Sequence, residues 1–200
     1  MHVSQFIEQN YPEYYSWNSY PADKTAAFSK IKDEWGIFSN FTHTPLTVGG
    51  VTFDCAERLF QVMKFSDTGA RRAVMSFPAG TGMKMKMKPL EKNPGARTEW
   101  GKVIVDVLKY CLMLKYEQSP EFRSELERSK GMYIVEDQSA FSKKADTYGA
   151  KLTADGSEYS GPNLMGRLLM ELRDNGRLEY SLPESLTDFS DLAIPSTTPS

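Results

Sequence analysis

Three polar residues of a predicted helix, Glu57, Gln61 and Lys64, have the types and the spacing to do chemistry. Positions i, i+4 and i+7 stack on one helix face over two turns. A carboxylate and an amine held close together in a partly buried groove can pass protons to and from a bound substrate. From the spacing alone, however, the solvated face of an ordinary amphipathic helix is the more frequent explanation. The rest of the sequence must decide between the two.

A hairpin and the helix itself are predicted to position these residues. Residues 45–52 contain short β-prone runs around Gly49 and Gly50, which is typical of a hairpin turn. A second stripe, at i, i+3, i+4 and i+7, predicts that a helix over 53–65 packs its other face on the core. That stripe consists of Ala56, Leu59, Phe60 and Met63.

The remaining elements indicate a mostly helical α+β fold in a single domain, with a small hairpin and sheet. Clear patterns predict helices over 67–77, 97–116 and 120–129, and a buried strand over 132–135 that ends at Glu136. The segment 161–173 starts as a turn of Gly, Pro and Asn and continues as an apolar helix with Asn163 as its N-cap. A helix N-terminus beside a glycine is also able to accept a phosphate, although a simple cap is the more frequent use.

Methionine and lysine alternate over residues 83–88. A period of two predicts a half-buried strand or an extended arm with Lys84, Lys86 and Lys88 on one side. Lysines on an edge strand usually serve to prevent unwanted strand pairing. If the segment has a function, a phosphate-rich ligand is the natural partner of its three amines.

The composition excludes several classes of function. The chain has 200 residues and a formal net charge of −2, so no global basic field attracts it to nucleic acid or to an anionic membrane. Cys55, Cys111, His2 and His43 do not have the spacing of metal ligands, and no metal site is expected. No stretch resembles a signal peptide or a membrane span. We expect a cytoplasmic protein with reduced cysteines.

The two ends of the chain differ from its centre. Residues 1–27 are rich in tyrosine and tryptophan but poorly periodic, and we expect this segment to pack on the domain. Residues 181–200 are rich in Ser, Thr, Pro and Asp, which predicts a flexible acidic tail. The catalytic domain is expected to span residues 28–180.

Taken in order, several motifs of residues 28–180 resemble the NADAR family, named for its proposed link to NAD and ADP-ribose metabolism. Each motif is weak by itself, but their joint order and spacing are specific. The motifs are Gly36-Ile37-Phe38-Ser39-Asn40-Phe41, Pro45 with Val48-Gly49-Gly50, Glu57 with Phe60-Gln61 and Lys64-Phe65, Trp100, Lys115-Tyr116, Val135-Glu136, and Asn163-Leu164-Met165-Gly166 followed by Leu169-Met170-Glu171-Leu172-Arg173.

The resemblance implies N-glycosidase chemistry, in which water cleaves the bond between the anomeric carbon of a ribose and a nitrogen. It also implies that Lys64 attacks this carbon and forms a Schiff base with the opened sugar. A lysine is a nucleophile only when it is neutral, so Glu57 is best explained as the proton carrier. Gln61 then holds the sugar or orients either partner. No cofactor is expected.

This chain departs from the family pattern at two places that bear on the substrate. The family's aromatic-Trp-Gly sequence after an Asp is here Asp146-Thr147-Tyr148-Gly149, so Tyr148 takes the place of the tryptophan as a stacking platform. The Gly-Arg pair that follows the second helix in the family is missing. Lys84, Lys86 or Lys88 would have to replace that arginine as a phosphate ligand.

The leading hypothesis is a hydrolase that removes ADP-ribose from guanine in DNA or RNA, which would act as an antitoxin or in anti-phage defence. Asn40 and Asn163 would bind ribose or phosphate, while Phe41, Trp100 or Tyr148 would stack on the base. The motifs place the other substrate-binding candidates at Phe38, Ser39, Glu136, Asp146, Gly149, Gly166 and Arg173.

Two other functions remain open. One is an N-glycosidase for phosphoribosylamino-pyrimidine intermediates of riboflavin synthesis. The other is a non-catalytic binder of ADP-ribose or NAD. The expected partner is therefore either an ADP-ribosylated nucleic acid or a small molecule like ADP-ribose, and the sequence does not set the oligomeric state.

Overall fold

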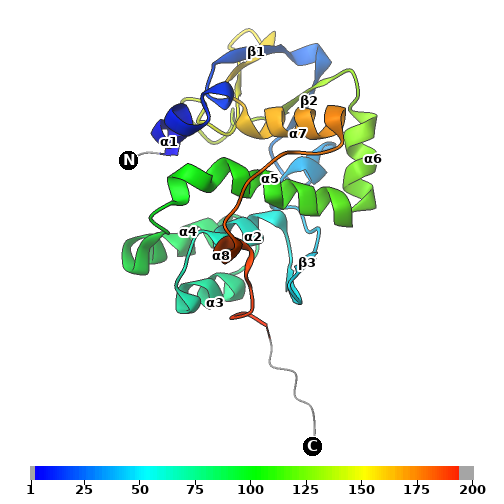
Figure 1. Ribbon diagram of the computed structural model, residues 1–200. Coiled ribbons are helices and arrows are strands. Elements are labelled where there is room, and N and C mark those ends of the chain that lie inside the picture. The colour runs from blue at the N-terminus through cyan, green and yellow to red at the C-terminus, as the bar shows by residue number, and fades with distance from the viewer. Residues whose placement is uncertain (1–2, 194–200) are drawn as a thin grey trace, which may run out of the picture.

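Helix α5 (Trp100–Gln118) runs through the middle of the computed structural model, and the other elements lie on either side of it (Figure 1). The structure describes residues 3–193. The apolar stripe of α5 is buried on several sides because α1, α2, α6 and α7 all contact this helix. The predicted helix over 97–116 is therefore confirmed, and it is the central scaffold of the fold.

One side of α5 carries the small sheets and helix α7 (Leu164–Asn175). Strand β1 (Asn18–Pro21) pairs antiparallel with β7 (Glu158–Gly161), which pairs with β6 (Lys151–Leu152). Strand β2 (Thr25–Phe28) pairs parallel with β5 (Tyr133–Glu136), so Phe28 lies opposite Glu136. The predicted strand over 132–135 is confirmed, and its pairing places Glu136 beside Phe28.

The other side of α5 carries a layer of helices and the hairpin. The hairpin joins β3 (Leu46–Val48) to β4 (Val51–Phe53) across Gly49 and Gly50, both at positive φ, as predicted. Helix α2 (Ala56–Met63) follows it directly, and α3 (Thr68–Ser76) packs on α2. Asp67 caps α3 by accepting a hydrogen bond from the Ala70 N–H at 2.7 Å.

The other elements complete the fold. They are helices α1 (Val3–Asn10), α4 (Thr81–Leu90), α6 (Pro120–Arg128) and α8 (Glu184–Thr187), the 3₁₀ turns η1 (Pro12–Tyr14), η2 (Ala22–Lys24) and η3 (Gly36–Phe38), and the turn η4 (Glu91–Gly95). The α+β prediction is confirmed, since helices dominate and the sheets are small. Among the helices of the described chain, none combines the length and the hydrophobicity that a membrane span requires.

The prediction of a strand or extended arm over 83–88 is wrong, because these residues lie within helix α4. Met83 and Met87, one helical turn apart, are 0% and 2% exposed, whereas Met85 is 73% exposed. Methionine and lysine both favour helices, and the run contains no β-branched residue that would favour a strand. In the helix, every fourth residue of the alternating run is therefore buried in the core, whereas a strand would bury every second residue.

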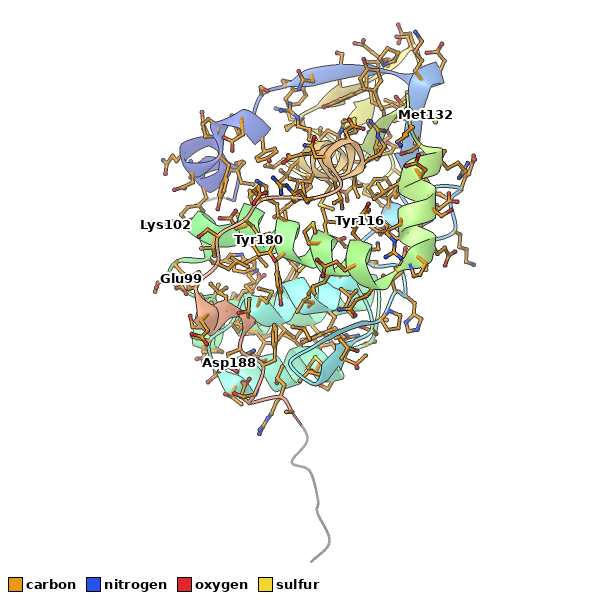
Figure 2. The ribbon with its side chains drawn as sticks, turned by 45° about the vertical axis from the view of Figure 1, so that its right-hand side comes forward. Glu99, Lys102, Tyr116, Met132, Tyr180 and Asp188 are labelled. Carbon is orange, nitrogen blue, oxygen red and sulfur yellow. The ribbon has the colours of Figure 1, made fainter. Side chains whose placement is uncertain are left out.

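The prediction of a flexible tail from residue 181 is wrong for residues 181–193. Leu186 and Phe189 are buried, and the Phe189 ring contacts the edge of Phe53 at a centroid distance of 5.1 Å. Arg71 donates a hydrogen bond to the Asp188 carbonyl at 2.7 Å, and Figure 2 shows Asp188 over the layer of α2 and α3. A few apolar residues within a polar composition are enough to fix this segment. Residues 194–200 of the predicted tail lie outside the described residues.

The aromatic segment at the N-terminus contributes both packing and strands. The Tyr14 hydroxyl donates a hydrogen bond to Glu171 Oε2 of α7 at 2.7 Å, and Tyr11 donates one to the Lys102 carbonyl of α5. Strands β1 and β2 both come from this part of the chain, so the expected boundary at residue 27 falls inside β2. The N-terminal segment is thus an integral part of the sheets.

Candidate active site

A cavity of about 330 Å³ lies where α2, α5, the residues after η3, the end of α4 and the end of β5 come together. Eleven of the predicted site residues line it. They are Ser39, Asn40, Phe41, Glu57, Gln61, Lys64, Lys88, Trp100, Glu136, Asp146 and Tyr148. Its volume is at the lower end of the range of small-molecule sites, roughly 300 to 1,000 Å³.

The polar face of α2 is the floor of this cavity and is not solvated. Glu57 and Gln61 are each 8% exposed, and Gln61 Nε2 donates a hydrogen bond to Glu57 Oε1 at 2.8 Å. The Glu57 N–H donates to the Asn40 carbonyl at 2.9 Å, which ties the start of α2 to the loop after η3. Because both side chains are buried, they do not form the solvated face of an ordinary amphipathic helix. Burying a carboxylate costs free energy unless the group is paired or hydrogen-bonded.

Two amide oxygens of the cavity have no hydrogen-bond partner. Asn40 Oδ1 and Gln61 Oε1 are buried acceptors, and both residues line the cavity. A buried acceptor without a donor costs about 1 to 3 kcal/mol. A ligand with hydroxyl or amino donors would satisfy both oxygens.

Lys64 follows the last residue of α2, and its amine forms an ion pair with Glu91. The Lys64 side chain is 17% exposed and that of Glu91 is 42% exposed. Arg97 fixes the backbone here, since its Nε donates to the Met63 carbonyl at 3.0 Å and its N–H donates to the Lys64 carbonyl at 2.9 Å. The bonded proton acceptor of Lys64 in the structure is therefore Glu91 and not Glu57.

A second polar group of the cavity is built from Gln138, Asp146 and Tyr148. Gln138 Nε2 donates to Asp146 Oδ1, the Asp146 N–H donates back to Gln138 Oε1 at 2.8 Å, and the Tyr148 N–H donates to Asp146 Oδ1 at 2.9 Å. Burial, followed by the charges of Glu57, Asp146 and Glu136, raises the pKa of Tyr148. Its hydroxyl thus remains protonated and is a donor among carboxylates.

Several predicted binding residues support strand β5 and do not line the cavity. Asn163 is fully buried at the left-handed N-cap of α7 without a capping hydrogen bond. Its side chain accepts from the Glu136 N–H at 3.2 Å and donates to the Ile134 carbonyl at 2.9 Å. A Cβ at Gly166 would lie 2.0 Å from that carbonyl, and one at Gly149 would lie 2.4 Å from the Glu136 carbonyl. These three residues hold Glu136 in place by close packing.

The other predicted residues outside the cavity also have structural contacts. Arg173 donates to the Ser129 and Met132 carbonyls at 3.0 and 2.8 Å. Phe38 is fully buried and stacks on Trp35 at a centroid distance of 5.6 Å. Lys86 lies over the Phe77 ring at 5.9 Å, and the side chain of Lys84 lies outside the described residues. Of the two proposed phosphate ligands whose side chains the structure describes, Lys86 and Lys88, Lys88 lines the cavity and Lys86 does not.

Sequence reasoning missed further residues of the cavity, above all Glu91 and Gln138. In the sequence, Glu91 comes shortly after the alternating lysines and Gln138 comes shortly after Glu136. Neither residue belongs to a periodic pattern that would indicate a functional position. The apolar walls were also missed: Phe28, Phe60, Met87, Ile104, Leu108 and Met165. Within residues 3–193, no group of three His, Cys, Asp or Glu side chains is placed to hold a metal ion.

Lys115 is a fully buried amine that positions the loop before the cavity. Its Nζ donates to the Ile37 carbonyl at 2.6 Å and to the Ser39 carbonyl at 2.9 Å, and it lies 4.7 Å from the Phe122 ring centroid. Burial lowers the pKa of Lys115 to about 7. A neutral amine has two N–H donors, which is the number that the two carbonyls require. Lys115 therefore fixes the backbone from which Ser39, Asn40 and Phe41 reach the cavity.

The substitution Lys115→Met is expected to remove part of the pH dependence of stability. Because the folded-state pKa is below that of the unfolded chain, the unfolded state binds more protons between pH 7 and pH 9. The free energy of unfolding of the wild type should thus rise over this range by about 2 kcal/mol from this residue. Chemical denaturation of both proteins at pH 7, 8 and 9 measures this contribution, which the methionine variant should lack. An equal rise in both proteins would contradict the assignment.

Comparisons with known proteins agree with one another. A family model described as the NADAR domain matches residues 27–177. The protein named N-glycosidase YbiA of Escherichia coli strain K12 is 33% identical over 161 residues, which is 78% of this chain and 91% of that protein. The protein of the same name from Shigella boydii serotype 4 has the same identity and coverage.

Two further matches extend the comparison. A riboflavin biosynthesis protein of Vibrio vulnificus strain YJ016 is 25% identical over 167 residues, which is 83% of this chain and 42% of that protein. The NMR structure of Escherichia coli YbiA has a TM-score of 0.58 and 29% sequence identity, and the match covers 76% of this chain and 84% of that chain. The matched range of the family model includes Glu57, Gln61, Lys64 and Glu91, but not helix α1.

Proposed function

The chain belongs to the NADAR domain family, and on that premise we propose that it is an N-glycosidase that cleaves the bond between C1′ of a ribose and a nitrogen. Relatives named N-glycosidase, at 33% identity over most of their length, support this activity. The observation that carries the proposal is the placement of Lys64, Glu57 and Gln61 in one cavity with unpartnered acceptors. This is the arrangement expected for a nucleophile, a proton carrier and a group that binds sugar hydroxyls.

The proposed reaction begins when Lys64 transfers a proton to Glu91, its bonded partner. The neutral Nζ then attacks C1′, the bond from C1′ to the base nitrogen breaks, and Glu57 carries the proton that the attacking amine releases to that nitrogen. The sugar ring opens to give a Schiff base on Lys64. Water adds to the C=N bond, and release of the amine regenerates Lys64 and gives the free sugar. Water is thus the only co-reactant.

Guanine carrying ADP-ribose is the substrate that we propose, and the chemistry of the cavity wall supports it. The wall is rich in acceptors: the carboxylates of Glu57, Glu91, Glu136 and Asp146, and the amide oxygens of Asn40 and Gln61. Guanine presents N–H and amino donors, and a ribose presents hydroxyl donors. Phe41, Trp100 and Tyr148 line the same cavity and offer surfaces for stacking on a base. Removal of this group would restore DNA or RNA modified by a toxin in the cytoplasm.

An oligonucleotide with one ADP-ribosylated guanine tests the proposal. Wild-type protein should release ADP-ribose and restore the unmodified guanine, as measured by mass spectrometry of the oligonucleotide. Lys86→Ala, at a lysine outside the cavity, serves as the control and should retain full activity. No release by the wild type would overturn the proposed substrate.

A phosphoribosylamino-pyrimidine of riboflavin synthesis is the second candidate substrate. The Vibrio vulnificus relative named for riboflavin biosynthesis favours it, and a cavity of about 330 Å³ has room for a pyrimidine with its ribose. Release of ribose 5-phosphate from the pyrimidine, without release of ADP-ribose from guanine, would identify this activity. Tight binding of ADP-ribose without turnover of either substrate would instead identify a binding protein.

A further inference from the structure

A second cavity, of about 270 Å³, adjoins the first at the ion pair of Lys64 with Glu91. The two cavities share Lys64, Glu91, Trp100 and Ile104 as lining residues. The second cavity is otherwise lined by Phe6, Ala96, Arg97, Thr98 and Gly101. The proposed nucleophile and its partner therefore stand at the boundary between two spaces, of which the proposed reaction uses only one.

Helix α1 provides one wall of this second cavity. The ring of Phe6 packs directly on Gly101 at the first turn of α5, where a Cβ would lie only 2.2 Å from the ring. Figure 2 marks Glu99 and Lys102 at this end of α5, close to α1. Because α1 lies outside residues 27–177, this wall comes from a segment that the family model does not cover.

The walls of the second cavity suit a planar ring better than a phosphate. Phe6, Trp100, Ile104 and Ala96 offer aromatic or apolar surface. The guanidinium of Arg97 is already engaged, since it donates to the Met63 and Ser185 carbonyls at 3.0 and 3.1 Å and lies 3.7 Å from Glu99. An aromatic base gains stacking energy against such walls without needing a free cation.

The first cavity does not hold a complete ADP-ribosyl group together with the base. A ribose and its base occupy a site of about 330 Å³, and the four carboxylates of its wall outnumber its two lysines, Lys64 and Lys88, which disfavours phosphate there. The adenosine diphosphate portion must then extend past the boundary at Lys64 and Glu91.

We propose that the second cavity is the adenine subsite of this enzyme, in which the adenine ring of an ADP-ribosyl substrate lies between Phe6 and Trp100. The inference rests on the proposed function, because only an ADP-ribosyl substrate carries this ring. It makes α1 a determinant of specificity. A phosphoribosyl substrate would leave the second cavity empty.

Binding of ADP-ribose and of ribose 5-phosphate, measured by isothermal titration calorimetry, tests the subsite without requiring turnover. Wild-type protein should bind ADP-ribose at least about 10-fold more tightly than ribose 5-phosphate, as expected for one stacked base. Ala96→Phe fills the cavity from an exposed position and should weaken ADP-ribose binding about 10-fold while changing ribose 5-phosphate binding less than about 2-fold. Phe6→Ala should have the same selectivity, because it removes one stacking surface.

Ala154→Phe is the matched control, since Ala154 is an exposed alanine outside both cavities. It should bind both ligands like the wild type. Equal affinity of the wild type for the two ligands, or equal weakening of both by Ala96→Phe, would overturn the subsite. Selective binding of ADP-ribose together with no cleavage of ADP-ribosylated guanine would instead refute the proposed function and leave the subsite standing.

Discussion

Replacement of Lys64 by alanine is expected to lower the rate of ribose–nitrogen cleavage by about 10³-fold or more, because it removes the nucleophile of a covalent mechanism. The structure favours this role because Lys64 is a partly buried amine at the cavity, with its backbone fixed by Arg97 and a carboxylate bonded to it. Single-turnover kinetics with the ADP-ribosylated oligonucleotide measures the loss at the chemical step. Protein stability should change by less than about 1 kcal/mol, as is usual for a partly exposed ion pair.

Lys64→Arg is the informative control for this prediction. Arginine keeps the positive charge and is able to pair with Glu91, but its guanidinium does not lose a proton in proteins. A nucleophilic role predicts that Lys64→Arg is as inactive as Lys64→Ala. Substantial activity in the arginine variant would show that Lys64 contributes only its charge.

Glu57→Gln is expected to lower the same rate by about 10² to 10⁴-fold, the usual contribution of a general acid. Glutamine has the shape of glutamate, and its side-chain oxygen is able to accept the hydrogen bond that Gln61 Nε2 now donates to Glu57 at 2.8 Å. The floor of the cavity is thus preserved while the transferable proton is lost. Single-turnover rates of the two proteins measure the effect.

The nature of the leaving group separates acid catalysis from simple positioning. A base whose glycosidic nitrogen is already cationic, such as the nicotinamide of NAD, needs no proton in order to depart. The loss caused by Glu57→Gln should be much smaller with such a substrate than with guanine, whereas the loss caused by Lys64→Ala should be similar with both. Equal losses for Glu57→Gln with both substrates would assign Glu57 a positioning role.

The sequence predicted the parts of the fold in which local periodicity and burial agree. Helix α2 follows from its apolar stripe, and the hairpin before it follows from Gly49 and Gly50. The alternation over 83–88 misled the prediction because a strand and a helix both place Met83 and Met87 on one face, and only Met85, which is 73% exposed, distinguishes the two. Residues 181–193 were predicted to be flexible because their overall composition is polar. Two apolar side chains among them, Leu186 and Phe189, are buried and fix the segment.

The site was predictable where the functional side chains lie on one element, and it was not where they come from several. Glu57, Gln61 and Lys64 lie on α2 or directly after it, so their spacing made them candidates, and the family motifs elsewhere in the sequence favoured a site over a solvated helix face. Glu91 reaches Lys64 from the turn after α4, and only the tertiary fold brings the two together. Asn163 has the residue type of a ligand-binding group, yet its amide is used to hold β5, which sequence cannot distinguish.

Trapping with borohydride is the most direct test of the proposed mechanism. Borohydride reduces a Schiff base to a stable secondary amine, so its addition during turnover should leave the sugar attached to the protein. Peptide mass spectrometry is expected to find the adduct on Lys64, dependent on both substrate and borohydride, with no adduct at any site in Lys64→Ala. Continued turnover in borohydride without an adduct, or an adduct on a different lysine, would contradict the assignment of Lys64 as the nucleophile.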